Sequence, residues 1–110
     1  MIVTFELDGQ EFMAINGGPQ FKFTEAISMF VDCEDQAEVD RLWNTLSAGG
    51  EPGQCGWLKD KYGLSWQIIP KQFMKLVQDP DPIKSKRVMD TMLKMNKMIV
   101  ADLQAAHDHV

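Results

Sequence analysis

Two short runs of the chain place polar side chains among aromatic and aliphatic ones. In residues 26–30 (AISMF) the even positions include Ser28 and Phe30, and in residues 65–69 (SWQII) the odd positions include Ser65 and Gln67. Because alternate residues of a strand share a face, each run would present these side chains on one surface. A few polar groups among apolar walls are typical of a small-molecule pocket. A solvated sheet face or an oligomer interface is the alternative.

Residue types that carry covalent or metal chemistry are sparse. Cys33 and Cys55 fit neither a Cys-x-x-Cys pattern nor a zinc-ligand spacing, and no internal histidine could activate them, so both are interpreted as small apolar residues. His107 and His109 form His-Asp-His near the C-terminus, which could bind a transition metal, although a frayed surface terminus is the preferred interpretation. Glu25 could act as a general base, with a solvated carboxylate as the alternative.

The elements that must position these residues follow from the periodicity. Residues 2–7 and 11–15 predict a hairpin around the turn Asp8-Gly9, and residues 25–31 predict a strand. Residues 35–46 have apolar positions at helical spacing. Two Trp- and Ile-rich runs within residues 55–70 predict a second hairpin.

The predicted helix has one apolar stripe, which must be buried against a sheet. We expect it to face the side that carries Ile27, Met29 and Val31 together with Trp66 and Ile68. Ser28, Phe30, Ser65 and Gln67 would then lie on the opposite side, with Ile69.

Beyond Pro70 the sequence becomes helical. Residues 73–77 predict a short helix, and the segment 79–82 (DPDP) ends it while supplying Asp81 as the N-cap of a helix over residues 82–95. The methionine-rich apolar positions of this tail indicate packing against a neighbour. We expect the tail to cover part of the sheet or a second subunit.

The length and net charge of the chain exclude several classes of function. With 110 residues the chain is expected to be a single domain over residues 1–110. Its net charge of −5 argues against a nucleic-acid partner, because no cluster of Lys and Arg could displace counterions from phosphates. No run of about 18 apolar residues predicts a membrane span, and no signal peptide is recognised. A cytoplasmic location is the default expectation.

Several motifs carry a family resemblance that covers nearly the whole chain. They are residues 30–36 (FVDCEDQ), Trp43, 49–52 (GGEP), 55–60 (CGWLKD), 62–69 (YGLSWQII) and 79–82 (DPDP). With them the chain resembles the PhnB-like family, often labelled 3-demethylubiquinone-9 3-methyltransferase, of the vicinal oxygen chelate superfamily, alongside glyoxalase I, bleomycin-resistance and dioxygenase domains. The resemblance implies an α+β fold of glyoxalase-like βαβββ modules whose sheets curl around a cavity, commonly in dimers.

Compared with this family pattern the chain resembles one complete module plus the last hairpin of a preceding one. Residues 1–18 correspond to that hairpin, residues 25–70 to the complete βαβββ module, and residues 71–110 to a helical tail. The sequence therefore looks N-terminally truncated relative to the pattern. Because a half-open sheet exposes unpaired edges and an apolar face, we expect a homodimer with partner-completed sheets, or a missing segment outside this chain.

The resemblance also locates the metal site of the superfamily's metalloenzymes. Two of its ligand positions fall at about Ala26 and at Gln67, and the first hairpin offers only Phe12 or Ala14 nearby. A methyl group has no lone pair, and a lone amide oxygen is a weak ligand for a divalent cation. No bound metal and no other cofactor is therefore predicted. Methyl transfer is judged unlikely as well, because no Gly-rich turn opens a helix after a first strand.

The sequence thus favours a protein that binds, and could convert, a small organic molecule in a sheet-lined cavity. The predicted lining residues are Phe12, Asn16, Ser28, Phe30, Ser65 and Gln67, with Trp57 as a wall. One alternative is a metal-dependent lyase, isomerase or dioxygenase whose ligands come from outside this chain. A purely structural, dimerising remnant is another. Whether the protein is an enzyme stays open at this point.

Overall fold

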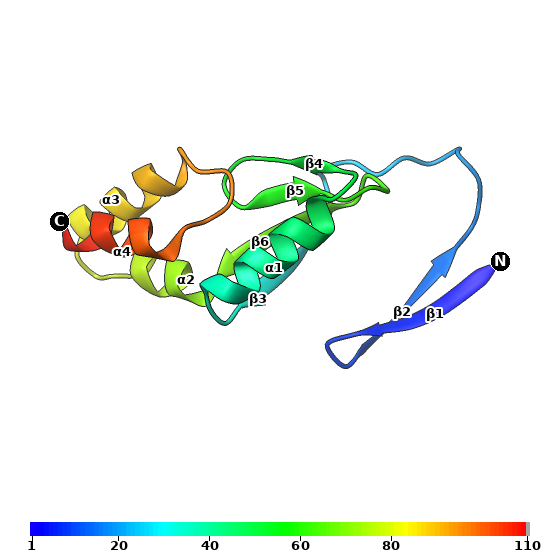
Figure 1. Ribbon diagram of the computed structural model, residues 1–110, viewed down its shortest axis with the longest axis horizontal. Helices are drawn as coiled ribbons and strands as arrows, with labels where there is room; N and C mark the ends of the chain where they lie inside the picture. The colour runs from blue at the N-terminus through cyan, green and yellow to red at the C-terminus, as the bar shows by residue number, and fades with distance from the viewer. Residues whose placement is uncertain (110) are drawn as a thin grey trace.

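The computed structural model describes residues 1–109, and it begins with a separate hairpin (Figure 1). Strands β1 (Ile2–Leu7) and β2 (Gln10–Ile15) pair antiparallel. Asp8 and Gly9 both have positive φ values, +50° and +79°, as a type I′ turn requires. The predicted hairpin is confirmed. All its strand residues are exposed except Phe12, which is half-buried.

A four-stranded sheet forms the centre of the molecule, in the order β3-β6-β5-β4. Its strands are β3 (Ser28–Cys33), β4 (Glu51–Pro52), β5 (Trp57–Lys59) and β6 (Ser65–Pro70). Strands β3 and β6 pair in parallel, and the remaining pairs are antiparallel. The predicted hairpin within residues 55–70 is confirmed. Strand β3 begins at Ser28 and not at residue 25, because the N–H of Ala26 donates to Thr24 Oγ1 (3.3 Å) in a preceding turn.

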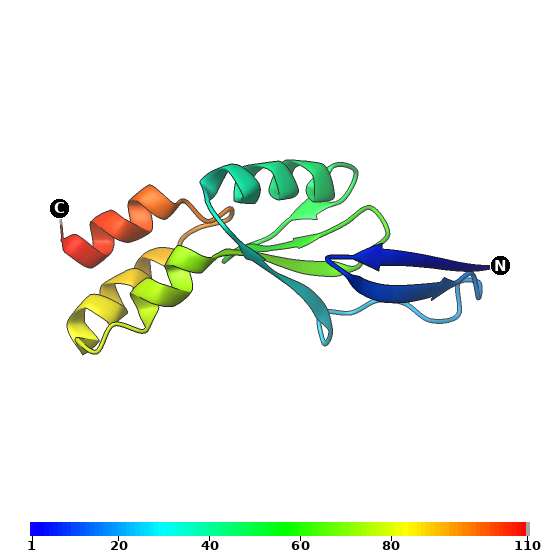
Figure 2. The same cartoon turned by 90° about the horizontal axis from the view of Figure 1, so that it is seen from below.

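Helix α1 (Gln36–Ser47) covers one face of this sheet (Figure 2). It begins where the Asp35 side chain accepts a hydrogen bond from the Glu38 N–H (2.9 Å), a typical N-cap. Its apolar stripe is buried as predicted; the resulting core contains Cys33, Val39, Trp43, Leu58 and Ile68, with Val31, Leu42, Leu46 and Trp66 packed around it. Ile27 was wrongly expected on this face: it precedes the strand and is 73% exposed.

Three further helices form a second layer at the end of β6. They are α2 (Lys71–Val77), α3 (Pro82–Met92) and α4 (Val100–Asp108). Their core contains Phe73, Leu76, Val88, Met98 and Leu103, and it includes Ile69 of the sheet. The expectation that the tail covers part of the sheet is therefore confirmed.

Helix α3 begins where the sequence predicts but ends earlier than predicted. Asp81 accepts a hydrogen bond from the Ile83 N–H (2.9 Å) and Pro82 is the first helical residue, as predicted. The helix ends at Met92, earlier than the predicted residue 95. Beyond it the chain turns, and the Met95 carbonyl accepts a hydrogen bond from the Cys55 N–H (2.8 Å) in the loop between β4 and β5.

The element order β3-α1-β4-β5-β6 is the predicted βαβββ order, and the fold class is α+β. The molecule is elongated, 53 Å by 26 Å by 23 Å, because the β1–β2 hairpin lies at the end opposite to α2–α4 (Figure 1). Among residues 1–109, no helix combines the length and apolar character that a membrane crossing needs.

Candidate functional site

Five of the seven predicted lining residues lie on one face of the four-stranded sheet. The register pairs Ser28 with Ser65, Phe30 with Gln67, and Trp57 with Gln67. Their strand neighbours Val31, Leu58, Trp66 and Ile68 pack under α1, so these five residues face the other way. We call this side, carrying Ser28, Phe30, Trp57, Ser65 and Gln67, the open face.

The open face is held by one internal hydrogen bond and contains one unpaired hydroxyl. Gln67 Nε2 donates to Ser28 Oγ at 2.9 Å across the β3–β6 pair. Ser65 is 1% exposed, and within the described part of the chain its Oγ has no hydrogen-bond partner. Buried polar groups in native proteins are almost always paired, with protein atoms, ordered water or a ligand, so the Ser65 hydroxyl is available to a group that enters the pocket.

A pocket of about 170 Å³ opens beside Ser65. Trp57, Leu58 and Pro52 supply its apolar wall, and Lys59 and Glu25 supply its charge. We call it the Lys59 pocket. It is formed where the segment before β3 meets β4, β5 and β6.

The Lys59 pocket contains an ion pair that sequence reasoning did not find. Lys59 Nζ lies 2.5 Å from Glu25 Oε1, and the Glu51 carboxylate lies on the same pocket wall. The hydrogen bond from Lys59 lowers the pKa of Glu25, and the same bond raises the pKa of Lys59. Both groups are therefore charged at neutral pH. Nothing in the sequence pairs Lys59 with a distant glutamate, because the two residues are 34 positions apart.

Phe12 and Asn16 lie away from the open face, in the β1–β2 hairpin. The Phe12 ring stacks on Phe5 with a centroid distance of 5.8 Å. The Asn16 N–H donates to the Met1 carbonyl (3.0 Å) at the hairpin's end. Asn16 lines a larger groove of about 570 Å³, between the hairpin and the β5–β6 turn. Within one chain the structure therefore divides the predicted lining set between two places.

The Cys33 thiol is poorly suited to nucleophilic chemistry. Cys33 is fully buried under α1, and burial, with the nearby Glu38 and Asp32 carboxylates, raises its pKa to about 11. A thiol with such a pKa is protonated at neutral pH and is not a nucleophile. This agrees with the interpretation of Cys33 as a core residue.

The positions implied for a superfamily metal do not fit a divalent cation. Ala26 has no donor atom, and Gln67 offers one uncharged amide oxygen, which is a weak ligand for a divalent cation. Across residues 1–109, no group of three or more His, Cys, Asp and Glu side chains is placed so that it could hold a metal ion. We therefore derive no chemistry through a metal at this site.

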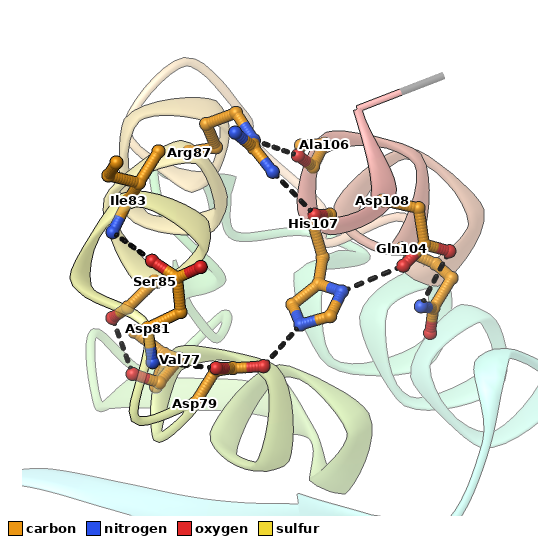
Figure 3. A network of polar contacts seen from close by, with 10 residues as sticks. All are labelled: Val77, Asp79, Asp81, Ile83, Ser85, Arg87, Gln104, Ala106, His107 and Asp108. Atoms are coloured by element: carbon orange, nitrogen blue, oxygen red, sulfur yellow. Dashed lines mark hydrogen bonds and ion pairs between the residues drawn. The ribbon is translucent and has the colours of Figure 1, made fainter.

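His107 is ordered and does not lie in a frayed terminus, contrary to the sequence interpretation (Figure 3). Its Nε2 lies 2.7 Å from Asp79 Oδ2, and its Nδ1 lies 2.8 Å from Asp108 Oδ1. Arg87 of α3 adds hydrogen bonds to the carbonyls of Ala106 and His107, both at 2.9 Å. These contacts fasten α4 to α3 and to the loop before it, which the isolated tripeptide His-Asp-His could not reveal.

This network predicts a pH-dependent contribution to stability. Hydrogen bonds to Asp108 and Asp79 raise the pKa of His107, so its contribution is complete below the ordinary value of 6.5 and is lost as the pH rises through the raised pKa. The pKa values of both carboxyls are lowered, chiefly by His107, so their contribution is complete above 3.8 and is lost as the pH falls through the lowered values.

His107→Gln should therefore lower the melting temperature most at about pH 5 to 6, and by a smaller margin above about pH 8. Lys84 of α3 adds a weak coulombic effect that lowers the pKa values of Asp79 and Asp108. Calorimetric scans across pH would check this, with His109→Gln as the control. A deficit that does not change with pH would contradict the charged network.

Comparison with known proteins identifies the group to which this fold belongs. The family model described as 3-demethylubiquinone-9 3-methyltransferase matches residues 1–69, which include the hairpin, α1 and most of the four-stranded sheet. No curated protein matches the chain.

Two solved structures resemble it. One, titled a putative 3-demethylubiquinone-9 3-methyltransferase, PhnB protein, from Bacillus cereus, is 39% identical with a TM-score of 0.57, and the match covers 64% of each chain. The other, a Pseudomonas aeruginosa protein, is 19% identical with a TM-score of 0.54, covering 64% of this chain and 62% of that one, and shows similarity of fold alone. The matches thus span less than two thirds of either structure. On the family match and the shared fold, the chain belongs to the 3-demethylubiquinone-9 3-methyltransferase, or PhnB-like, family.

Proposed function

We propose that this protein binds a small organic molecule on the open face of its sheet, without a tightly bound metal. Ser65 carries the proposal: it lines the Lys59 pocket, it is 1% exposed, and its hydroxyl has no partner within the described chain. An unpaired buried polar group typically costs about 1–3 kcal/mol. A ligand atom that pairs with this hydroxyl would remove that cost.

The surrounding residues support the same reading. Trp57 is a half-buried aromatic wall of the pocket, and Phe30 is 52% exposed on the adjoining surface. The hydrogen bond to Ser28 fixes the Gln67 amide, which retains a second N–H and carbonyl lone pairs for a ligand. Apolar walls with a few oriented polar groups are what ligand pockets require.

We propose further that the protein acts as a homodimer in which each hairpin completes the partner's sheet. Phe12 and Asn16 of one hairpin would then reach the open face of the other subunit. The hairpin exposes a row of large apolar side chains, among them Val3, Phe5 and Leu7. The radius of gyration is 16.1 Å, whereas a compact domain of this length has about 13 Å. Both observations are expected of a chain that packs against a second copy.

The family name suggests methyl transfer, but the proposal does not include it. The only adjacent glycines before β3, Gly17 and Gly18, precede Pro19 in the linker from β2. That linker leads into a strand, so it does not form the strand-to-helix turn that binds a methyl-donor cofactor in the usual α/β enzymes.

The binding proposal can be tested by denaturing untagged protein and identifying the released small molecules by mass spectrometry. Wild-type protein should release a retained organic molecule, and Gln67→Leu should retain at least ~10-fold less. Gln72→Leu is the matched control, since Gln72 also donates one hydrogen bond, to the Glu34 carbonyl at 2.9 Å, but lies in α2. Equal retention by Gln67→Leu and wild type would contradict a site on the open face.

A further inference from the structure

The Lys59–Glu25 ion pair lies at the wall of the proposed site and joins two unlike segments. Lys59 is in β5, with its backbone paired to Ser65 and to Glu51 in the sheet. Glu25 lies in the irregular segment before β3, and its side chain is 62% exposed. The ammonium is thus anchored by the sheet, whereas the carboxylate comes from a segment that takes no part in the strand pairing.

We propose that the ligand is a small monocarboxylic acid whose carboxylate replaces that of Glu25 beside Lys59. This rests on the proposed binding function and adds the chemical class of the ligand. Glu25 already presents to Lys59 the group that such a ligand carries. Exchange keeps the ammonium paired and releases Glu25 to water, so little electrostatic stabilisation is lost, because exposed ion pairs contribute little.

The rest of the pocket restricts the acid. Its volume of about 170 Å³ is below the range of roughly 300–1,000 Å³ of pockets for drug-sized ligands, so the ligand is small. Pro52, Leu58 and Trp57 would contact an apolar or aromatic body. Glu51 stays beside Lys59 and repels further negative charge, which favours one carboxylate over two.

Three probes of similar shape and different charge test whether the ligand is a carboxylic acid: benzoate, benzamide and benzylamine. Each is titrated into ¹⁵N-labelled protein while the indole N–H signals of the three tryptophans are followed. Benzoate should bind with a Kd at least ~3-fold lower than benzamide and should shift the Trp57 signal. Trp43 lies under α1, and its signal should stay in place.

Variants of the ion pair make the test specific. Glu25→Gln removes the internal competitor and should strengthen benzoate binding ~2- to 5-fold, while Lys59→Met should weaken it ~2- to 5-fold. Glu34→Gln is the matched control: Glu34 pairs with Lys71 at 2.6 Å with similar exposure, outside the pocket. It should leave the benzoate Kd unchanged.

Each other outcome overturns the acid assignment. Equal binding of benzamide and benzoate, or preference for benzylamine, would reject a carboxylate ligand and still support the proposed binding function, since Trp57 would report the ligand. If none of the three probes binds, the carboxylate ligand is also rejected. The mass-spectrometric test for a retained molecule would then decide the proposed binding function by itself.

Discussion

Trp43→Ala should destabilise the protein by about 3–5 kcal/mol, the usual cost of truncating a buried tryptophan. Trp43 is 8% exposed and lies between α1 and the sheet, in contact with the core that contains Val39 and Ile68. Removing the indole leaves a cavity in the contact that holds the helix on its face of the sheet. Urea unfolding at one fixed protein concentration measures the change in the free energy of unfolding.

Trp57→Ala is the control for the assignment of the two sheet faces. Trp57 is half-buried on the open face, so its truncation should cost less than half as much as that of Trp43. If the two substitutions cost the same, or if Trp43→Ala costs less than about 1 kcal/mol, the assignment of a core face and an open face is wrong.

Phe5→Glu should convert the proposed homodimer into monomers, raising the dimer dissociation constant at least ~100-fold. Phe5 shares one face of the hairpin with Val3, Leu7 and its stacking partner Phe12. A carboxylate buried there at an interface would lose its hydration without gaining a partner. Sedimentation velocity over a range of protein concentrations measures the effect.

Thr4→Glu adds the same charge to the opposite, more polar face of the same strand, which also carries Glu6. It should leave the dimer intact, because its side chain stays in water. A wild-type protein that sediments as a monomer at tens of micromolar, or equal dissociation by Thr4→Glu and Phe5→Glu, would contradict packing through the Phe5 face.

Local patterns predicted much of the fold because each depends on nearby residues. The turn Asp8-Gly9, the N-cap Asp81 and the stripe Val39–Trp43 each indicate an element without reference to the rest of the chain. Strand parity then separated Ser65 and Gln67 from Trp66 and Ile68, and the structure places these pairs on opposite faces. The element order also carried the family resemblance, which the family match confirms.

The features that the sequence could not predict depend on contacts between distant residues. Lys59 meets Glu25 only because the segment before β3 reaches across the end of β6 to β5. His107 meets Asp79 only because α4 packs back on α3 and on the loop before it. Phe12 and Asn16 were grouped with the sheet residues through the family pattern, and their place at that face remains a prediction that depends on a second chain.

Native mass spectrometry of untagged protein tests the central claim most directly, because it reports subunit number, bound metal and retained organic molecules in one spectrum. We predict a species of twice 12.5 kDa that carries an organic molecule and no stoichiometric divalent metal. A monomer without any bound molecule would contradict the account. A dimer with one divalent metal per chain would contradict it as well, and would favour metal-dependent catalysis with ligands from outside this chain.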